Sequence, residues 1–365
     1  MTLSHAQEQM WFLHQMEPSP AYTVPVAYDI TGPLDVDVLC AALQTVVDRH
    51  EILRTEFVDV DGQPTARVHP PTPLPCPLVE LTSGEPELRE ALKAACAQPL
   101  TLDGPHRMSA RVYRLTGEHH VLFLMFHHIA VDGMSVQCLL DEVQRYCGSG
   151  GTGAPLPPAP QFADHVKAER AADSDPTSDD AHLSYWRTRL AGVDEVTLPA
   201  DRPRPTGTAT HSGRLLRHDL RPGFMAAVEG LAVRERVTPF MVLLAAFAWT
   251  LGRTTGSTDI PVGVATSSRA SAESFETVGL FVNMLTVRNR IDPALTFRAF
   301  LQQTRQNLLA DLEHREVPFS QVVRVIRPPP PPRGEPAVQR GHGLRAQKTG
   351  PESVAGSGFA APGRA

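Results

Sequence analysis

The sequence predicts an α+β fold of two domains, and three observations support this. The chain of 365 residues is 42% apolar and 20% charged, an ordinary globular composition that is long enough for two hydrophobic cores. Short apolar runs typical of strands are mixed with longer segments of helical spacing, and Asp61 with Gly62 forms an antiparallel hairpin turn. Residues 148–160, which apart from Leu156 are small residues and prolines, are expected to connect the two halves.

The first half is predicted to begin with a helix and to contain a buried central strand. Ser4 begins the helix, because Gln7 three residues later completes a capping-box pattern. Met10, Leu13 and Met16 follow on one face of this helix. The further elements are, in order, a strand at residues 24–30, a helix capped by Asp35, a strand ending in the Asp61 hairpin, a helix at residues 87–96, a strand at 108–115, the central strand at 121–126 and a helix from about Ser135.

The second half is predicted to mix helices and strands in the same way. Thr238 followed by Pro239 is a typical helix start, and the apolar segment after it indicates a buried helix. The other elements are helices at residues 162–170 and 181–190, a Pro-rich extended segment at 198–205, strands at 259–266 and 281–291, a helix after Thr296 and a short helix after Pro318. Residues 328–365 begin with five prolines and show no amphipathic period, so we expect them to be disordered.

The residues that can carry chemistry lie in the segment HHVLFLMFHHIAVDG, residues 119–133. Its apolar run predicts a strand buried on both faces, and His127 with His128 stands at the end of that strand. Neighbouring strand residues point to opposite faces, so one imidazole can face a cavity while the other braces the backbone. Gly133 would permit a sharp turn that brings Asp132 back beside the imidazoles. A lone histidine would more often be a core residue, but the spacing HHxxxDG favours chemistry.

Composition excludes several classes of function. The net charge is −6, and the sequence contains no basic stripe. Both observations argue against nucleic acid or a membrane surface as a partner. No apolar run reaches the roughly 18 residues of a membrane-spanning helix, and no signal segment is recognisable, so we expect a cytoplasmic protein. The five cysteines are scattered without CxxC spacing, which fits a reducing compartment and predicts no metal site.

Six ordered segments show a resemblance to a known family. They read SHAQEQMWFLHQMEP, RHEILRTEF, HHIAVDG, YWRTRLAG with LPADRPRP, VGLFVNMLTVR and HREVPF, and they extend over residues 1–327. The chain resembles the condensation domains of nonribosomal peptide synthetases, within the chloramphenicol acetyltransferase-like superfamily. The resemblance implies two acetyltransferase-like α/β sandwich lobes in a V arrangement, at residues 1–160 and 161–327, with a tunnel between them.

The resemblance also implies an activity and its partners. Upstream and downstream carrier proteins would deliver an acyl or peptidyl thioester and an aminoacyl thioester on phosphopantetheine arms, and an adenylation domain is a further partner. The amine of the second substrate would attack the carbonyl of the first to form a peptide bond. No Ser or Cys nucleophile is required, and the chain itself is expected to bind no cofactor.

The motif residues receive specific roles from the resemblance. His128 would act as the base or the positioning group for the attacking amine, which has a solution pKa of about 7.7 to 8. His127 would be structural and point away from the tunnel. Asp132 would form an ion pair with an arginine and fix the loop, and Arg49 and Arg269 are both candidates for that arginine.

Two further residues are expected at the tunnel, and one residue departs from the family. Gly133 would lie where the tunnel passes close to the backbone, and Asn283 would line it from the second lobe. Met134 stands where the family often has Trp, which would alter the acceptor side. Retention of HHxxxDG argues against a heterocyclising variant, and MSVQ after the motif argues against an epimerisation domain.

The end of the sequence differs most from the family, and it leaves other functions open. After HREVPF the family continues with further strands, whereas this chain has a polyproline and Gly/Arg-rich tail that resembles a truncated ending. We therefore expect an incomplete second lobe with an exposed sheet edge and impaired stability. The alternatives are a free-standing O- or N-acyltransferase of the same superfamily, a non-catalytic recruitment module and a catalytically impaired fragment.

Overall fold

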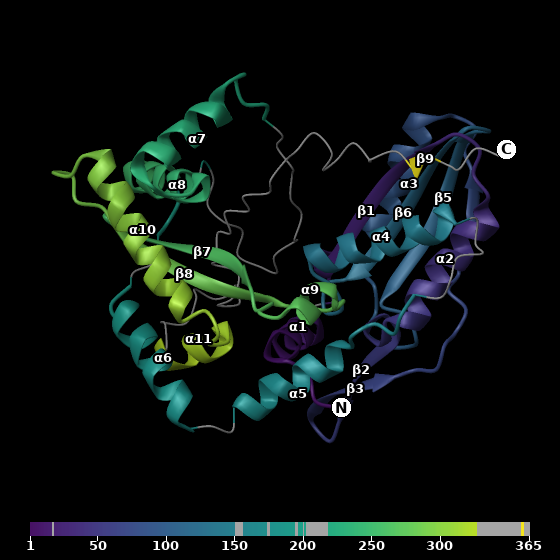
Figure 1. Ribbon diagram of the computed structural model, residues 1–365, viewed down its shortest axis with the longest axis horizontal. Coiled ribbons are helices and arrows are strands. Elements are labelled where there is room, and N and C mark those ends of the chain that lie inside the picture. The colour runs from purple at the N-terminus through teal and green to yellow at the C-terminus, as the bar shows by residue number, and fades with distance from the viewer. Residues whose placement is uncertain are drawn as a thin grey trace. The chain divides into compact units, whose positions relative to one another are not determined.

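The computed structural model divides into two compact units, described separately below (Figure 1). It describes residues 1–16, 18–149, 156–173, 176–193, 196–199, 201, 218–326 and 359–360. Among these residues, unit 1 comprises Met1–Ser174 and Arg269–Phe281, with the short strand near the C-terminus, and unit 2 comprises Asp175–Ser268 and Val282–Ile326. Both units mix helices and strands, which confirms the predicted α+β class.

Unit 1 is built on a five-stranded sheet. In spatial order its strands are β4 (Leu78–Glu80), β5 (Met108–Thr116), β6 (His119–His127), β1 (Thr23–Thr31) and β9 (Phe359–Ala360). The central strand β6 pairs antiparallel with both β1 and β5, while β4 and β9 pair parallel with their neighbours. The predicted central strand is thus confirmed, with the two histidines at its C-terminal end.

The strand β6 is buried on both faces, as the sequence predicts. Its alternate side chains enter two hydrophobic cores on opposite sides of the sheet, and the two sets are Leu122, Leu124 and Phe126, and Val121, Phe123 and Met125. The first core contains residues of α2 (Val36–Arg49) and α4 (Gly133–Gly148), and the second contains residues of α3 (Glu85–Cys96). These helices can be followed in Figure 1.

Local sequence signals set the other elements of unit 1. Asp35 caps α2 by accepting from the backbone N–H groups of Asp37 and Val38, each at 3.1 Å. The hairpin of β2 (Thr55–Val60) and β3 (Gln63–Val68) turns at Asp61 and Gly62, whose φ angles are 54° and 77°, so the predicted turn is confirmed. The remaining helices are α1 (His5–Met16), η1 (Pro20–Tyr22), η2 (Glu51–Arg54), α5 (Phe162–Ala172) and α9 (Ala272–Glu276).

The predicted capping of α1 is confirmed, and Met10 of its apolar face packs against the first core. Ser4 and Gln7 bond reciprocally, at 3.2 and 3.1 Å. The buried residues are Gln7, Trp11 and His14, whereas Met16 is 70% exposed. Tertiary partners decide this face, because Gln7 donates to the Ile129 carbonyl at 3.3 Å and His14 contacts the end of β6. Helix α1 therefore packs against the segment that carries the motif.

Unit 2 is built on a two-stranded antiparallel ribbon. Strands β7 (Asp259–Ser267) and β8 (Val282–Arg290) pack with α7 (Phe224–Glu235), α8 (Pro239–Thr255) and α10 (Phe297–Glu313) in one core. A second core joins Leu285 of β8 to α6 (Pro176–Arg189) and α11 (Phe319–Ile326). Thr238 and Thr296 cap α8 and α10 as predicted, while α7 is a helix that the sequence patterns did not reveal.

The division between the units differs from the boundary expected at residue 160. Helix α5 belongs to unit 1 because Phe162 and Val166 lie in its first core. Residues 269–281 also belong to unit 1, and β8 begins at Val282 because the Phe281 ring packs edge-to-face on Phe162 with centroids 5.1 Å apart. Residues 150–155 of the connecting segment, the Pro-rich segment beyond residue 201 and the expected disordered tail apart from β9 lie outside the described residues.

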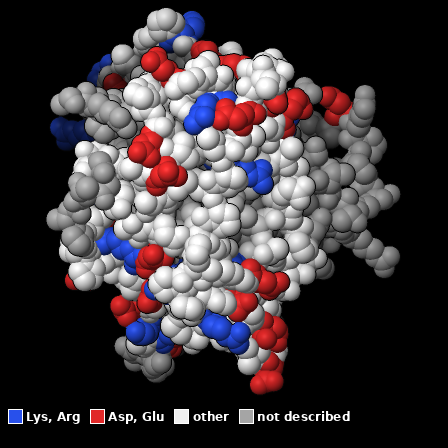
Figure 2. Space-filling view, turned by 90° about the vertical axis from the view of Figure 1, so that its right-hand side faces the viewer, with Lys and Arg blue, Asp and Glu red and all other residues white. Residues whose placement is uncertain are grey.

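Acidic and basic side chains are interspersed among uncharged residues on the face shown in Figure 2. Within the part of the chain that the structure describes, none of the helices combines the length and apolarity needed to cross a membrane.

Candidate functional site

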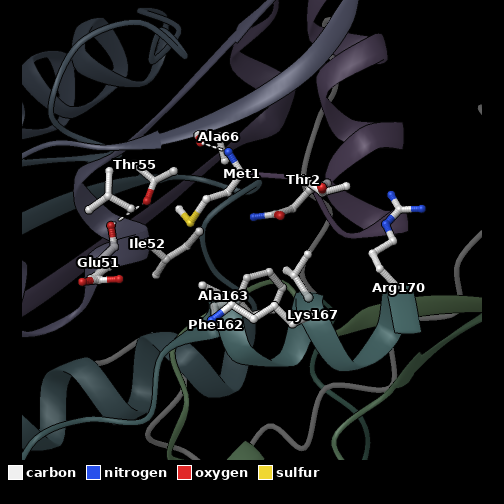
Figure 3. A pocket seen from close by; sticks show the side chains of 13 residues that line it. Met1, Thr2, Glu51, Ile52, Thr55, Ala66, Phe162, Ala163, Lys167 and Arg170 are labelled. Carbon is white, nitrogen blue, oxygen red and sulfur yellow. Dashed lines mark hydrogen bonds between the residues drawn. The ribbon is translucent and has the colours of Figure 1, made fainter. Parts of the chain in front are cut away.

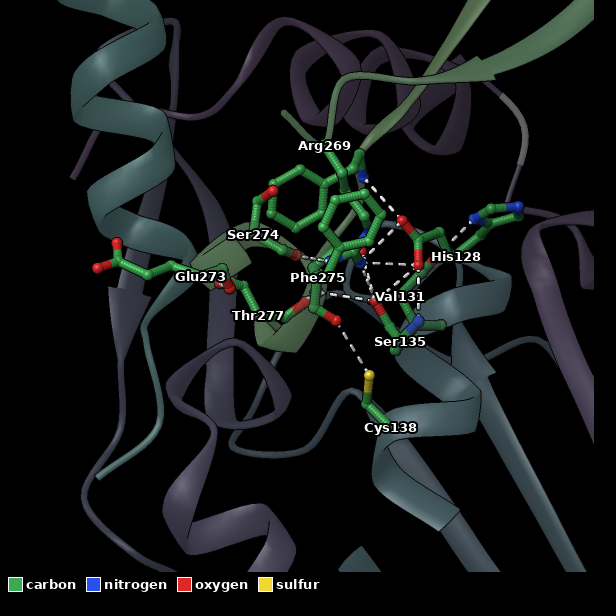
Figure 4. Close-up of polar contacts among 12 residues, drawn as sticks. His128, Val131, Ser135, Cys138, Arg269, Glu273, Ser274, Phe275 and Thr277 are labelled. Carbon is green, nitrogen blue, oxygen red and sulfur yellow. Dashed lines mark hydrogen bonds and ion pairs between the residues drawn. The ribbon is translucent and has the colours of Figure 1, made fainter. Parts of the chain in front are cut away.

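The strand β6 ends between the two histidines of the motif. His127 is its last residue, and His128 begins the turn that leads to α4. The backbone N–H of His128 donates to the Tyr22 carbonyl at 2.8 Å, and its ring Nδ1 lies 2.9 Å from the Val131 carbonyl oxygen. Because a carbonyl only accepts, Nδ1 carries the hydrogen and the neutral ring has its lone pair on Nε2. The ring is half-buried, and in Figure 4 it points away from Arg269.

His127 is held inside unit 1. It is 1% exposed, its backbone N–H donates to the Arg107 carbonyl at 2.9 Å, and its ring Nδ1 accepts from the backbone N–H of Ile129 at 3.1 Å. Burial, followed by the nearby charges of His14, Arg107 and His128, lowers the pKa of His127 to about 3. His127 is therefore neutral at physiological pH and braces the backbone of the turn.

The lowered pKa of His127 predicts acid sensitivity of the fold. Because protonation is more favourable in the unfolded chain, where the pKa is near 6.5, the free energy of unfolding falls as the pH drops below that value. We expect this group alone to contribute a loss of about 2 kcal/mol by about pH 5. Urea unfolding of the wild type and His127→Gln at neutral pH and at about pH 5 measures it. An equal loss in both proteins would contradict this assignment.

Asp132 caps α4 and forms a buried ion pair. Its carboxylate accepts from the backbone N–H of Ser135 at 2.7 Å, which satisfies one of the free amides at the helix start. Both carboxylate oxygens lie 3.0 Å from Nη2 of Arg269. The Asp132 and Arg269 side chains are 5% and 0% exposed, so neither is screened by solvent. The pair fixes the end of the motif to residues 269–281 within unit 1.

Arg269 is the centre of a closed polar cluster (Figure 4). It also donates to the carbonyls of Ser274 and Thr277 and to the hydroxyl of Ser135, and its guanidinium carbon lies 3.9 Å from the Phe281 ring centroid. The Ser135 hydroxyl is fully buried and bridges to the backbone N–H and carbonyl of Gly279, at 3.0 and 2.8 Å. These contacts hold residues 269–281 against the first turn of α4.

Of the two arginines left open by the sequence, Arg269 is the partner of Asp132. Arg49 pairs instead with Glu142 at 3.2 Å and donates to the Pro157 carbonyl. His50 approaches the same Glu142 carboxylate at 3.0 Å. Arg49 thus ties the end of α2 to α4 and to the segment that follows α4.

Gly133 and Asn283 have simple structural surroundings. Gly133 is the first residue of α4 and does not adopt a left-handed φ, so the expected sharp turn at this glycine is wrong. Among the described residues, no atom beyond its own neighbours lies within 4 Å of a Cβ added there. In unit 2, Asn283 donates to the carbonyls of Arg315 and Val317, each at 2.8 Å, and so holds the HREVPF segment. Its lining of a tunnel stays a prediction.

A cavity of about 360 Å³ lies in unit 1 next to the supports of the motif (Figure 3). Gln7 lines it and also donates to the Ile129 carbonyl at 3.3 Å. Phe162 lines it from α5 and lies so close to Gly279 that an added Cβ there would be 2.0 Å from the Phe162 ring. A glycine at residue 279 is therefore required for the close packing of α5 on residues 269–281.

Sequence reasoning missed several residues that support the motif, namely Gln7, His14, Tyr22, Ser135 and Phe281. Gln7 and His14 could have been found from their spacing with Trp11. The three residues stand at i, i+4 and i+7, which places them on one helix face. The described residues contain no group of three His, Cys, Asp or Glu side chains that could hold a metal ion. All five cysteines are free thiols, and Cys138 donates to the Phe275 carbonyl at 3.4 Å.

Comparison with known proteins assigns the family. A family model for the Condensation domain matches residues 1–337. The chain belongs to the Condensation-domain family. The resemblance expected from the six sequence segments is thereby confirmed.

The relatives of this condensation domain are large synthetases. The chain is 37% identical over 337 residues to CymA of Salinispora arenicola, named a probable nonribosomal peptide synthetase, with 90% of this chain covered. It spans 4%, 9% and 31% of the lengths of three such curated relatives.

Solved structures share the fold. The X-domain from teicoplanin biosynthesis, also solved in complex with OxyB, is 27% identical with a TM-score of 0.80, and the match covers 90% of this chain and 74% of that one. The first condensation domain of the calcium-dependent antibiotic synthetase, in complex with substrate analogue 2a, is 25% identical with a TM-score of 0.75, covering 89% of this chain and 76% of that one.

Proposed function

We propose that this condensation domain forms an amide bond between two substrates tethered to carrier proteins. The α-amine of a downstream aminoacyl thioester attacks the carbonyl carbon of an upstream acyl or peptidyl thioester. The new C–N bond forms as the C–S bond breaks, and the upstream phosphopantetheine thiol leaves. The proton lost by the amine passes to His128 and from there to the departing thiolate. Two of the curated relatives are named a nonribosomal peptide synthetase or synthase, which supports this class of reaction.

The orientation of the His128 ring is the single observation that carries the proposal. Its Nδ1–H donates to the Val131 carbonyl at 2.9 Å, and this bond fixes the direction of the basic Nε2. The ring is half-buried and therefore accessible. A base must have its lone pair fixed in this way before the amine arrives. The Asp132–Arg269 pair holds the end of the turn at the start of α4 and has no role in proton transfer.

Magnitudes indicate that positioning contributes more than base catalysis. A well-placed general base contributes about 10²- to 10⁴-fold. Alignment of two tethered substrates can remove roughly 7 to 11 kcal/mol from the barrier, which is a larger factor. The open space beside Gly133, at the start of α4, supports passage of a substrate close to this backbone.

The proposal is tested with donor and acceptor loaded on two separate carrier proteins. Product is measured by mass spectrometry, and a parallel reaction supplies the acceptor as a soluble amine at the same concentration. We expect rapid product formation only when both substrates are carrier-bound. Equal rates with the soluble amine would identify the chain as a free-standing acyltransferase instead.

A second candidate function is a non-catalytic recruitment module. The fold likeness to the X-domain, which has been solved with the protein OxyB bound, favours this candidate. A folded chain that forms no product in either reaction, yet binds a protein partner, would support recruitment over catalysis.

A further inference from the structure

A pair of buried histidines lies directly behind the turn that carries His128. His14 of α1 is 8% exposed and His127 of β6 is 1% exposed. Nε2 of His127 lies 3.3 Å from Nδ1 of His14, and the two rings meet edge-to-face with centroids 5.1 Å apart. The Condensation-domain assignment gives His14 no role.

The backbone of Ile129 sets the direction of the hydrogen bond between these two rings. The backbone N–H of Ile129 can only donate, and it points at Nδ1 of His127 from 3.1 Å. In the neutral ring the hydrogen of His127 must then be on Nε2, which donates to Nδ1 of His14. His14 is in turn neutral with its own hydrogen on Nε2. Burial is the main cause that lowers the pKa of each histidine, so both rings are neutral near physiological pH.

This chain of bonds fixes the backbone on both sides of His128. Ile129, whose N–H is accepted by His127, is the residue directly after His128. The other bonds of the turn run from Ala130 N–H to the His127 carbonyl at 3.0 Å and from His128 N–H to the Tyr22 carbonyl at 2.8 Å. If His127 took the other tautomer, its Nδ1–H and the Ile129 N–H would face each other, and neither hydrogen would have an acceptor. The turn therefore requires His127 to carry its hydrogen on Nε2, and that hydrogen requires a buried acceptor.

We propose that His14 is a positioning residue for His128, because it accepts the hydrogen bond that holds His127 in the Nε2–H tautomer. Its action is indirect, through His127 and the Ile129 amide. The effect on catalysis rests on the proposed function, whereas the effect on the tautomer does not. An acceptor is what the site needs, so glutamine can replace His14 in this role and phenylalanine, which fills similar space, cannot.

The test combines imidazole ¹H–¹⁵N spectra with kinetics. Chains labelled with ¹⁵N-histidine are compared as wild type, His14→Gln and His14→Phe near neutral pH, in parallel with the two-carrier assay. We expect His127 as the Nε2–H tautomer in the wild type and His14→Gln. In His14→Phe we expect that signal to change, the His128 ring signal to shift, and kcat to fall with little change in KM. The expected fall is on the order of 10- to 100-fold, by analogy with the loss of a hydrogen-bonding partner of a metal-bound histidine.

Two results would overturn the proposal. The first is a wild-type spectrum with His127 as the Nδ1–H tautomer, which decides the matter even where a variant fails to fold. The second is a His14→Gln protein that matches His14→Phe in spectrum and kcat, since His14 would then act only by its shape. A wild type that forms no product refutes the proposed function, while the spectra still decide whether His14 sets the tautomer and the place of the His128 ring.

Discussion

Replacement of His128 by alanine is expected to lower kcat for amide formation by about 10²- to 10⁴-fold. The variant loses the Nε2 lone pair that accepts the amine proton and the polar group that orients the amine. It keeps the turn, because the backbone bond from residue 128 to the Tyr22 carbonyl does not depend on the side chain. Single-turnover rates with both carriers loaded give the chemical step directly, and we expect KM for the acceptor carrier to change little.

A matched control for this variant lies at the other end of the same strand. His119 begins β6, and its ring lies 3.0 Å from the Asp29 carboxylate. We expect His119→Ala to keep the wild-type rate. Equal rates for His128→Ala and the wild type would remove His128 from the mechanism.

The second large effect is expected for Arg269→Ala, on stability. The change leaves the Asp132 carboxylate buried without its cation and removes donors from Ser135 and from two backbone carbonyls. Loss of one partner of a buried ion pair typically costs about 3 to 5 kcal/mol. Urea unfolding followed by circular dichroism measures the free energy of unfolding.

Two further variants test the origin of that loss. Arg67 forms an ion pair with Glu56 at 3.4 Å but is 63% exposed, so Arg67→Ala is expected to cost at most about 1 kcal/mol. The double variant Asp132→Asn with Arg269→Ala leaves no buried charge and should recover part of the stability lost in the single variant. A loss for Arg269→Ala no larger than that for Arg67→Ala would show that the buried pair contributes little.

The parts of the fold that were predictable are those specified by neighbouring residues. Asp35 and Thr296 cap their helices through amides two or three positions away, and Asp61 with Gly62 sets a hairpin through its own φ angles. The apolar run of β6 predicted a strand that is buried on both faces. Such signals act within a few residues, so no tertiary knowledge was needed to recognise them.

Other features depended on residues that are distant in the sequence. The burial of Gln7 and His14 in α1 could not be predicted from neighbouring residues, because their partners lie 122 and 113 residues away. The choice between Arg49 and Arg269 likewise could not be made from pattern. Arg269 is separated from Asp132 by 137 residues, and its pairing follows from the return of residues 269–281 to unit 1.

That return constrains the construction of chimeric synthetases. Asp132 and Arg269 belong to one unit, but the first segment of unit 2, Asp175–Ser268, lies between them in the sequence. A hybrid joined by a single crossover after residue 174 would take the two halves of this ion pair from different parents, together with the Phe162 and Gly279 contact. Residues 1–174 and 269–281 of unit 1 stay together in an exchange only when both segments are transplanted from one parent, which requires three crossover points.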